Sequence, residues 1–199
     1  MEKFQIMGKK LEHHGHILDF YTYELKVPNG NTAYWDVLEH KGASAIIPVD
    51  EDGKIILVRQ YRGAIDDLLL EIPAGGRDSL EEDFLVCAAR ELEEEIGYRS
   101  DEIHHLVDYH SAAAYTSEKI AIYYTEKLIP SKQHLDENEF VQIERYSLEE
   151  LNAMIFGGRI TDGKTIAGIM AYQMLKHMNQ EKYRLCLLYT SQSPRDLST

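Results

Sequence analysis

Four glutamates, Glu91, Glu93, Glu94 and Glu95, crowd the end of a helical pattern. The helix dipole favours cations at this end, and glutamates three or four residues apart repel each other by roughly a few tenths of a kcal/mol. A sequence selected for stability alone would avoid this arrangement. The charge pattern leaves two comparable interpretations: a solvated acidic face, or a site for a hard divalent cation that prefers carboxylate oxygens. Arg90, four residues before Glu94, is spaced to steer these carboxylates.

The helix that carries the glutamates is expected within residues 76–98. Ser79 is a suitable N-cap, and Glu82, three residues later, can complete a capping box. Gly97 suits the position that follows the last helical residue. Apolar residues at helical spacing predict a buried stripe on this helix. Its members are Leu85, Ala88, Leu92 and Ile96.

The N-terminal residues predict a separate β-structure. Apolar and polar residues alternate over 21–27 and 32–39, and residues 28–31 supply turn chemistry between them. Residues 1–42 are therefore expected to form a β-hairpin arm that is too small for a core of its own. Residues 43–180 would form the main domain. The tail, 181–199, shares no pattern with the rest and is interpreted as flexible or non-native.

The main domain mixes strands and helices. Strands are expected at 43–49, 54–59, 68–72, 106–109, 120–125 and 140–146, and Pro73 with residues 74–76 should end the third of them in a loop. One helix should start at Ser147, which can form a capping box with Glu150. Another should start at Asp162 and reach about residue 179. This order of elements predicts an α/β sandwich.

Composition limits the classes of protein that the chain can belong to. The 199 residues carry a net charge of −13, which argues against partners such as nucleic acid or an anionic membrane surface. The two cysteines, Cys87 and Cys186, cannot make a disulfide framework, and Cys87 is expected to be a buried thiol. Neither a signal peptide nor a membrane-spanning stretch is apparent, so the expected location is cytoplasmic.

The spacing of the charged residues and glycines in and around this helix resembles the motif of a known family. Gly76, Glu82 and the run Arg90-Glu91-Leu92-x-Glu94-Glu95-x-Gly97 resemble the Nudix box, with Tyr98 in place of the more usual aliphatic residue. The surroundings, from about residue 35 to 179, resemble the ADP-ribose pyrophosphatase branch of the Nudix hydrolases. This resemblance implies a Nudix-type α/β/α sandwich with a mixed sheet. It also implies that the N-terminal β arm packs or exchanges across a homodimer.

The same resemblance implies a reaction and a metal site. Glu91, Glu94 and Glu95, with the backbone carbonyl of Ala74, would bind Mg2+, with Mn2+ as an alternative. A water activated by the metal would attack a phosphorus of a nucleoside diphosphate derivative. From ADP-ribose, the products would be AMP and ribose 5-phosphate.

Substrate-binding residues follow from the resemblance as well. Arg62 matches an arginine that contacts the substrate's diphosphate, as opposed to an ordinary surface arginine at a strand end. Trp35 matches an aromatic residue that stacks on adenine in some relatives, although a lone tryptophan is more often part of a core than a platform for a ligand.

The general base would come from one of two loops. Glu118 precedes the strand at 120–125, and Glu139 precedes the strand at 140–146. The sequence favours Glu118, because it is a solitary carboxylate between apolar and hydroxyl residues, whereas Glu139 lies in the acidic run DENEF. Either residue could instead be a solvated loop carboxylate.

Departures from the branch keep other functions open. Ala113 and Ala114 stand where a Pro-Gly loop is usual, so a nucleotide sugar such as GDP-mannose, or a dinucleotide, is an alternative substrate. A nucleotide-sensing binding module is an alternative of another class, disfavoured by the complete box. Residues 162–165, DGKT, lack the preceding strand and glycine spacing of a phosphate-binding loop.

Overall fold

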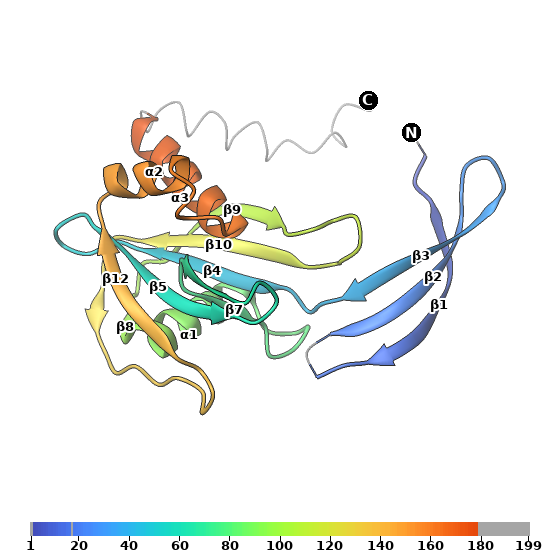
Figure 1. Cartoon of the computed structure of the whole chain (residues 1–199), viewed down its shortest axis with the longest axis horizontal. Helices are drawn as coiled ribbons and strands as arrows, with labels where there is room; N and C mark the ends of the chain where they lie inside the picture. The colour runs from blue at the N-terminus through green and yellow to red at the C-terminus, as the bar shows by residue number, and fades with distance from the viewer. Residues whose placement is uncertain (1, 17, 179–199) are drawn as a thin grey trace, which may run out of the picture.

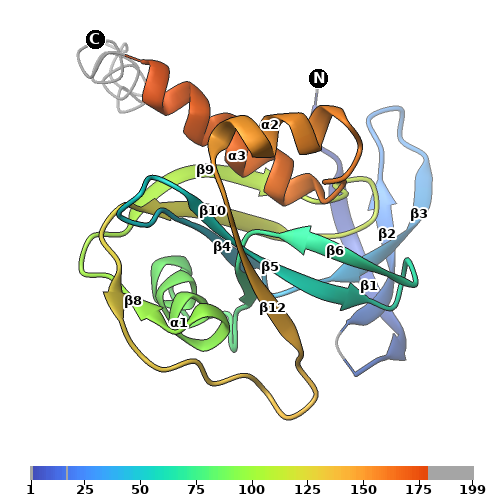
Figure 2. The same cartoon turned by 60° about the vertical axis from the view of Figure 1, so that its left-hand side comes forward.

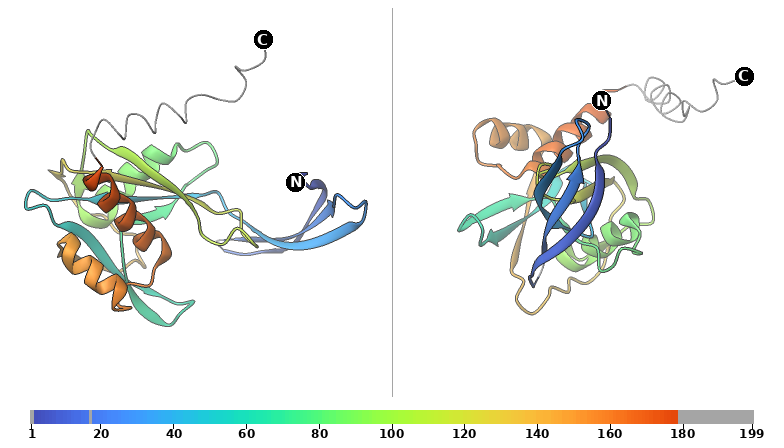
Figure 3. Two further views of the ribbon diagram at one scale, coloured as in Figure 1. Left: turned by 90° about the horizontal axis from the view of Figure 1, so that it is seen from above. Right: turned by 90° about the vertical axis from the view of Figure 1, so that its right-hand side faces the viewer.

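The computed structural model describes residues 2–16 and 18–178. Three strands, β1 (Gln5–His14), β2 (Asp19–Lys26) and β3 (Thr32–Glu39), form an antiparallel sheet in the order β1-β2-β3. This sheet is the arm, and it projects away from the body of the molecule (Figures 1 and 3). The sequence predicted only β2 and β3. In β1 the register shifts after Ile6 and after Leu11, which interrupts the alternation of apolar and polar residues that identifies a strand.

Two sheets build the body. One has the order β7-β4-β10-β9, in which β4 (Ala43–Pro48) and β10 (Lys119–Thr125) are parallel and β7 (Ala74–Gly76) and β9 (His104–His110) pair antiparallel with them. The other has the order β12-β5-β6, formed by β12 (Val141–Tyr146), β5 (Ile55–Arg62) and β6 (Asp67–Glu71). A small pair joins β8 (Tyr98–Arg99) to β11 (Ile129–Pro130). Residues 74–76, expected as a loop, form β7 because they pair with β4.

Helices cover both faces of these sheets. The helix α1 (Phe84–Ile96) lies on one face, and α2 (Leu148–Phe156) with α3 (Gly163–His177) lies on the other (Figure 2). Alternate residues of β4 separate the two cores: Ile46 packs with α1, whereas Ile47 belongs to the core beneath α2 and α3. The predicted α/β/α sandwich with a mixed sheet is confirmed.

The start of α1 differs from the prediction. Its N-cap is Asp83, whose side chain accepts a hydrogen bond from the backbone N–H of Leu85. Ser79 instead accepts from the N–H groups of Glu81 and Glu82 in a turn that precedes the helix. Leu85 is 41% exposed and is not part of the buried stripe, because the buried face of α1 is turned toward Cys87, Glu91 and Glu95. Gly97 follows the helix in a left-handed conformation, as predicted.

The other two helices begin where the sequence predicts. Ser147 and Glu150 form the capping box of α2, and Asp162 caps α3 through the backbone N–H of Thr165. The tail at 181–199 and Cys186 lie outside the described residues, and Cys87 is buried as expected. Within the described residues, no helix has the length and apolar character needed to cross a bilayer.

Candidate active site

The C-terminal half of α1 presses two carboxylates against the short strand β7. Glu95 is 2% exposed and accepts a hydrogen bond of 2.9 Å from the backbone N–H of Ala74. Glu91 is 7% exposed and packs against Gly75, where any Cβ would overlap the Glu91 carboxylate. A glycine is therefore required at residue 75 so that the strand can approach the acidic face of the helix.

Burial makes these carboxylates hard to ionise together. The pKa of Glu91 is raised to about 7, chiefly by desolvation; Arg90 opposes this rise, and the charges of Glu94 and Glu139 add to it. Desolvation, followed by the charge of Glu91, raises the pKa of Glu95 to about 8. Two buried like charges of this kind are stable when a cation lies near them.

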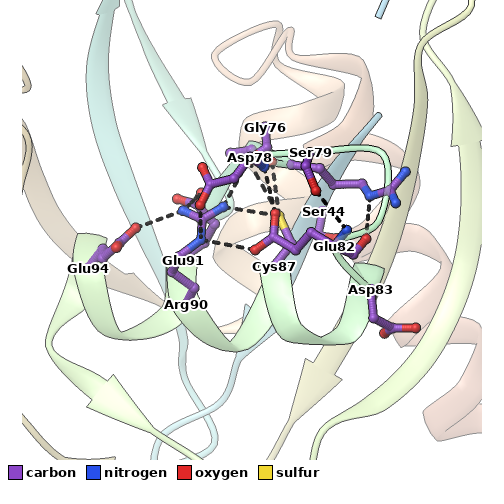
Figure 4. A network of polar contacts seen from close by, with 12 residues as sticks. Ser44, Gly76, Asp78, Ser79, Glu82, Asp83, Cys87, Arg90, Glu91 and Glu94 are labelled. Carbon is purple, nitrogen blue, oxygen red and sulfur yellow. Dashed lines mark hydrogen bonds and ion pairs between the residues drawn. The ribbon is translucent and has the colours of Figure 1, made fainter. Parts of the chain in front are cut away.

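Arg90 supplies a positive charge of the protein next to these carboxylates (Figure 4). Its Nη1 donates to Glu91 at 2.7 Å and to Glu94 at 2.8 Å, and its Nη2 donates to the carbonyl of Gly76 at 2.9 Å. Its Nε donates to Glu82 at 3.2 Å, and Glu82 also accepts from the N–H of Asp78. Glu82 therefore anchors Arg90 and does not cap the helix.

The donor set fits a hard divalent cation. Within the described residues, no three His, Cys, Asp or Glu side chains already converge as ligands, and Arg90 holds Glu94. Glu94 has the most exposed of the three carboxylates, with 37% of its side chain accessible, and can leave Arg90 at little cost. Glu91, Glu94 and Glu95 then offer only oxygen atoms, the ligands that Mg2+ prefers.

Two cavities flank β7. The first, here called the glutamate cavity, has a volume of about 300 Å3 and is lined by Glu91, Glu94, Asp136 and Glu139 among others. The second, called the lysine cavity, has a volume of about 340 Å3. Its polar lining residues include His40, Tyr109, Ser111, Glu118, Asp162 and Lys164. Arg62, Ala74, Gly75 and Gly76 line both cavities, so the strand β7 forms the ridge between them.

The two candidate bases lie on opposite sides of this ridge. Glu139 lines the glutamate cavity and accepts a hydrogen bond of 3.2 Å from Gln60 Nε2. Glu118 lines the lysine cavity, where its carboxylate lies 3.6 Å from Nδ1 of His40. Glu139 shares its cavity with Glu91, and its negative charge contributes to the raised pKa of both Glu91 and Glu95.

Arg62, which lines both cavities, is held in place by a buried partner. Its Nε and Nη2 each donate to Glu71 at 2.7 Å, and Lys164 forms an ion pair with the same carboxylate. Burial tends to raise the pKa of Glu71, but Arg62 and Lys164 hold it below the usual value. Lys164 also lies 3.2 Å from Asp162, so two cations share two carboxylates at the edge of the lysine cavity.

Sequence reasoning missed the contribution of Lys164 and Glu71. The motif at 162–165 is not a phosphate-binding loop, yet its lysine lines the lysine cavity. A useful signal was the lone carboxylate, Glu71, within the apolar run LLLEIP, because a buried charge requires a partner.

Trp35 is not brought to either cavity. It lies on β3 in the arm, is 50% exposed, and has the ring of Phe4 at a centroid distance of 5.6 Å. It is therefore not a core residue of this chain, and its stacking role stays a prediction.

Comparison with known proteins identifies the family. The model of the NUDIX domain matches residues 38–168. The chain is 31% identical over 170 residues to the ADP-ribose pyrophosphatase of Bacillus subtilis, a match that covers 84% of this chain and 91% of the relative. It is 33% identical over 168 residues to the methanol dehydrogenase activator of Bacillus methanolicus, covering 82% and 90% respectively. GDP-mannose pyrophosphatases of Yersinia are also among the relatives.

A solved structure has the same fold. The crystal structure of an ADP compounds hydrolase superposes with a TM-score of 0.76 at 20% identity, covering 88% of this chain and 95% of that one. With its box helix, its buried glutamates and these relatives, the chain belongs to the Nudix hydrolases and resembles their ADP-ribose pyrophosphatase branch.

Proposed function

We propose that the protein hydrolyses the diphosphate of ADP-ribose to AMP and ribose 5-phosphate, with Mg2+ bound at Glu91, Glu94 and Glu95. The observation that carries this proposal is the pair of buried carboxylates, Glu91 and Glu95, which lie against the strand β7. The glutamate cavity, which Arg62 borders, lies beside them. Such a pair is costly without a cation and useful with one, because a divalent cation lowers the pKa of water and neutralises charge on a leaving phosphate.

The two cavities suit the two halves of the reaction. In the glutamate cavity, Glu139 accepts the proton of the attacking water as the new P–O bond forms. The bond to the bridging oxygen breaks, and that oxygen leaves with the other phosphate. Arg62, on the ridge, contacts the diphosphate, and Lys164 contacts the half of the substrate that enters the lysine cavity. The sequence favoured Glu118 as base, but its place in the lysine cavity suits a contact with that half of the substrate.

A substrate panel tests the proposal. Purified protein is incubated with ADP-ribose, GDP-mannose, NADH and diadenosine polyphosphates, with Mg2+, with Mn2+ and with excess chelator, and the products are separated. ADP-ribose should be hydrolysed faster than GDP-mannose, and the chelator should abolish turnover. If ADP-ribose is among the poorest substrates, the proposed specificity is wrong. The GDP-mannose pyrophosphatase relatives then make a GDP-sugar the second candidate.

The arm supports a homodimer as part of this proposal. Ile6, Met7, Leu11, Tyr34 and Trp35 are exposed on it, and exposed apolar side chains on a projecting sheet are stabilised when a second surface covers them. Light scattering after size exclusion should give twice the monomer mass, and removal of residues 1–39 should give the monomer mass. A monomeric full-length chain would contradict the proposal.

A further inference from the structure

The segment that joins the arm to the body is hydrogen-bonded to the loop that carries Glu118. The backbone N–H of Leu38 donates to the carbonyl of Tyr115 at 2.8 Å, and the N–H of Ser117 donates to the carbonyl of Leu38 at 3.0 Å. Leu38 and Thr116 form an isolated parallel bridge at this point. The end of β3 is thus hydrogen-bonded to residues 115–117 while it still pairs with β2 in the arm.

The hydroxyl of Ser117 completes the connection. Its Oγ accepts a hydrogen bond of 2.9 Å from the backbone N–H of His40 and donates one of 3.3 Å to the carbonyl of the same residue. One side chain therefore satisfies both backbone polar groups of His40. Without the hydroxyl, those groups would need water or a shifted backbone to replace the lost bonds.

The ring of His40 lies between this connection and the cavity. Its Nδ1 accepts a hydrogen bond of 3.0 Å from the backbone N–H of Gly42 and lies 3.6 Å from the carboxylate of Glu118. Gly42 has a φ of +95°, and a Cβ there would lie 3.0 Å from the ring of Phe84. The turn after His40 therefore requires glycine at residue 42, and the ring of His40 lies beside the carboxylate of Glu118.

We propose that Ser117 is a positioning residue, which fixes Glu118 against His40 and thereby ties the lysine cavity to the root of the arm. The inference rests on the proposed function in one respect: Glu118 contacts the substrate half that enters this cavity. Ser117 itself is not among the residues that line the cavity, so it acts only through Glu118.

The kinetic test compares Ser117→Ala, Glu118→Gln and the double variant, using whichever nucleoside diphosphate derivative the panel shows to be hydrolysed. Ser117→Ala should raise KM about 3–10-fold with kcat within about twofold, because a displaced contact weakens binding more than the chemical step. In the Glu118→Gln background the same substitution should have almost no further effect, since contacting residues are not additive. Ser117→Thr, which keeps the hydroxyl, should restore KM to near the wild-type value.

A matched control separates positioning from general destabilisation. Ser147→Ala removes another hydroxyl that accepts from a backbone N–H, at the cap of α2 and away from both cavities. It should lower Tm at least as much as Ser117→Ala and leave KM unchanged. Equal KM effects of Ser117→Ala in both backgrounds, or wild-type kinetics for Glu118→Gln, would overturn the inference.

Hydrogen exchange gives a readout that needs no substrate. Ser117→Ala should speed amide exchange at residues 38–40 and 115–118, and Ser147→Ala should not. Unchanged exchange at these residues in Ser117→Ala would overturn the inference even if the panel identified a substrate. Faster exchange combined with a panel in which nothing is hydrolysed would leave the positioning role standing and contradict the proposed function.

Discussion

The carboxylate of Glu91 occupies the space in which any side chain at residue 75 would begin. A Cβ on Gly75 would overlap both oxygens and the carboxyl carbon of Glu91, whereas a Cβ on the next residue, Gly76, meets no atom within 4 Å. Two adjacent glycines on one strand therefore differ sharply in how much change they tolerate.

Gly75→Ala should reduce kcat by about 10²-fold or more, because Glu91 must move away from its place at the metal site. The fold should persist, since the displaced carboxylate can turn toward the glutamate cavity. Steady-state kinetics with circular dichroism checks this. Gly76→Ala is the matched control and should stay within a few-fold of wild-type activity. Similar activities for the two variants would show that the Glu91–Gly75 contact has no role in the reaction.

Glu95→Gln should abolish most of the activity, because a neutral amide replaces a carboxylate ligand of the metal. Glu93→Gln is the control, because Glu93 lies on the same helix but accepts a hydrogen bond from Ser131 and pairs with Arg99, whereas Glu95 accepts from the N–H of Ala74 in β7. It should keep activity within a few-fold of wild type. The assignment of the metal site fails if Glu91→Gln, Glu94→Gln and Glu95→Gln all retain near-normal rates.

The stability of the metal-free protein should fall as pH rises. Because burial raises the pKa of Glu95 to about 8, this carboxyl binds its proton more tightly in the folded state than in the unfolded state. Its contribution to stability is full below the unfolded pKa, about 4.3, and is lost progressively up to pH 8. Glu91, with a pKa of about 7, adds a loss over a similar window.

Urea denaturation of chelator-treated protein at pH 5 and pH 8 measures this loss, which should amount to about 1–3 kcal/mol. In Glu95→Gln, most of this pH-dependent loss of stability should be absent. Added Mg2+ should recover the lost stability of the wild-type protein at pH 8. It should stabilise the protein much less at pH 5, where protons compete with the metal. A metal-free protein that is more stable at pH 8 than at pH 5 would contradict the buried ionisation described here.

Lys164→Met should raise KM for the substrate about 10–100-fold with a smaller change in kcat, because a cation is lost from the edge of the lysine cavity. The bidentate pair with Arg62 still neutralises Glu71, so the protein should remain folded. Lys176→Met, at the far end of the same helix and half exposed, is the control and should leave KM unchanged. A normal KM for Lys164→Met would remove this residue from the substrate site.

The sequence was sufficient for the elements near the site whose signals are local in the chain. The box spacing identified the helix and its carboxylates, and capping chemistry located the starts of α2 and α3. Local patterns failed where two functions compete for one residue. Glu82 has the spacing of a capping partner, but its carboxylate bonds Arg90 and the backbone of Asp78, and Asp83 caps a helix that begins at Phe84.

Contacts between distant residues could not be predicted in this way. Lys164 and Glu71 are 93 positions apart and meet because the first turn of α3 is hydrogen-bonded to the residue after β6, through Thr165 and the N–H of Ile72. The division of the site into two cavities depends on the pairing of β7 with β4, which the residues Ala74–Gly76 do not signal by any alternation. This division is what changes the preferred base from Glu118 to Glu139.

The identity of the base is the last prediction. A base must reach the water that attacks phosphorus, and that water lies beside the metal ligands. Glu139 shares the glutamate cavity with Glu91 and Glu94, whereas Glu118 lies beyond the ridge with His40. Glu139→Gln should therefore lower kcat about 10²–10⁴-fold with little change in KM, and Glu118→Gln should mainly raise KM.

The pH profile distinguishes a base from a residue that only repels its neighbours. Loss of the base should remove the acidic limb of the kcat profile, because that limb reports the group that must be deprotonated for turnover. Glu137→Gln, two residues before Glu139 in the same acidic run, is the matched control and should keep both the rate and the limb. If Glu118→Gln loses the limb and Glu139→Gln keeps it, the roles are exchanged, and the attacking water is deprotonated from the side of the lysine cavity.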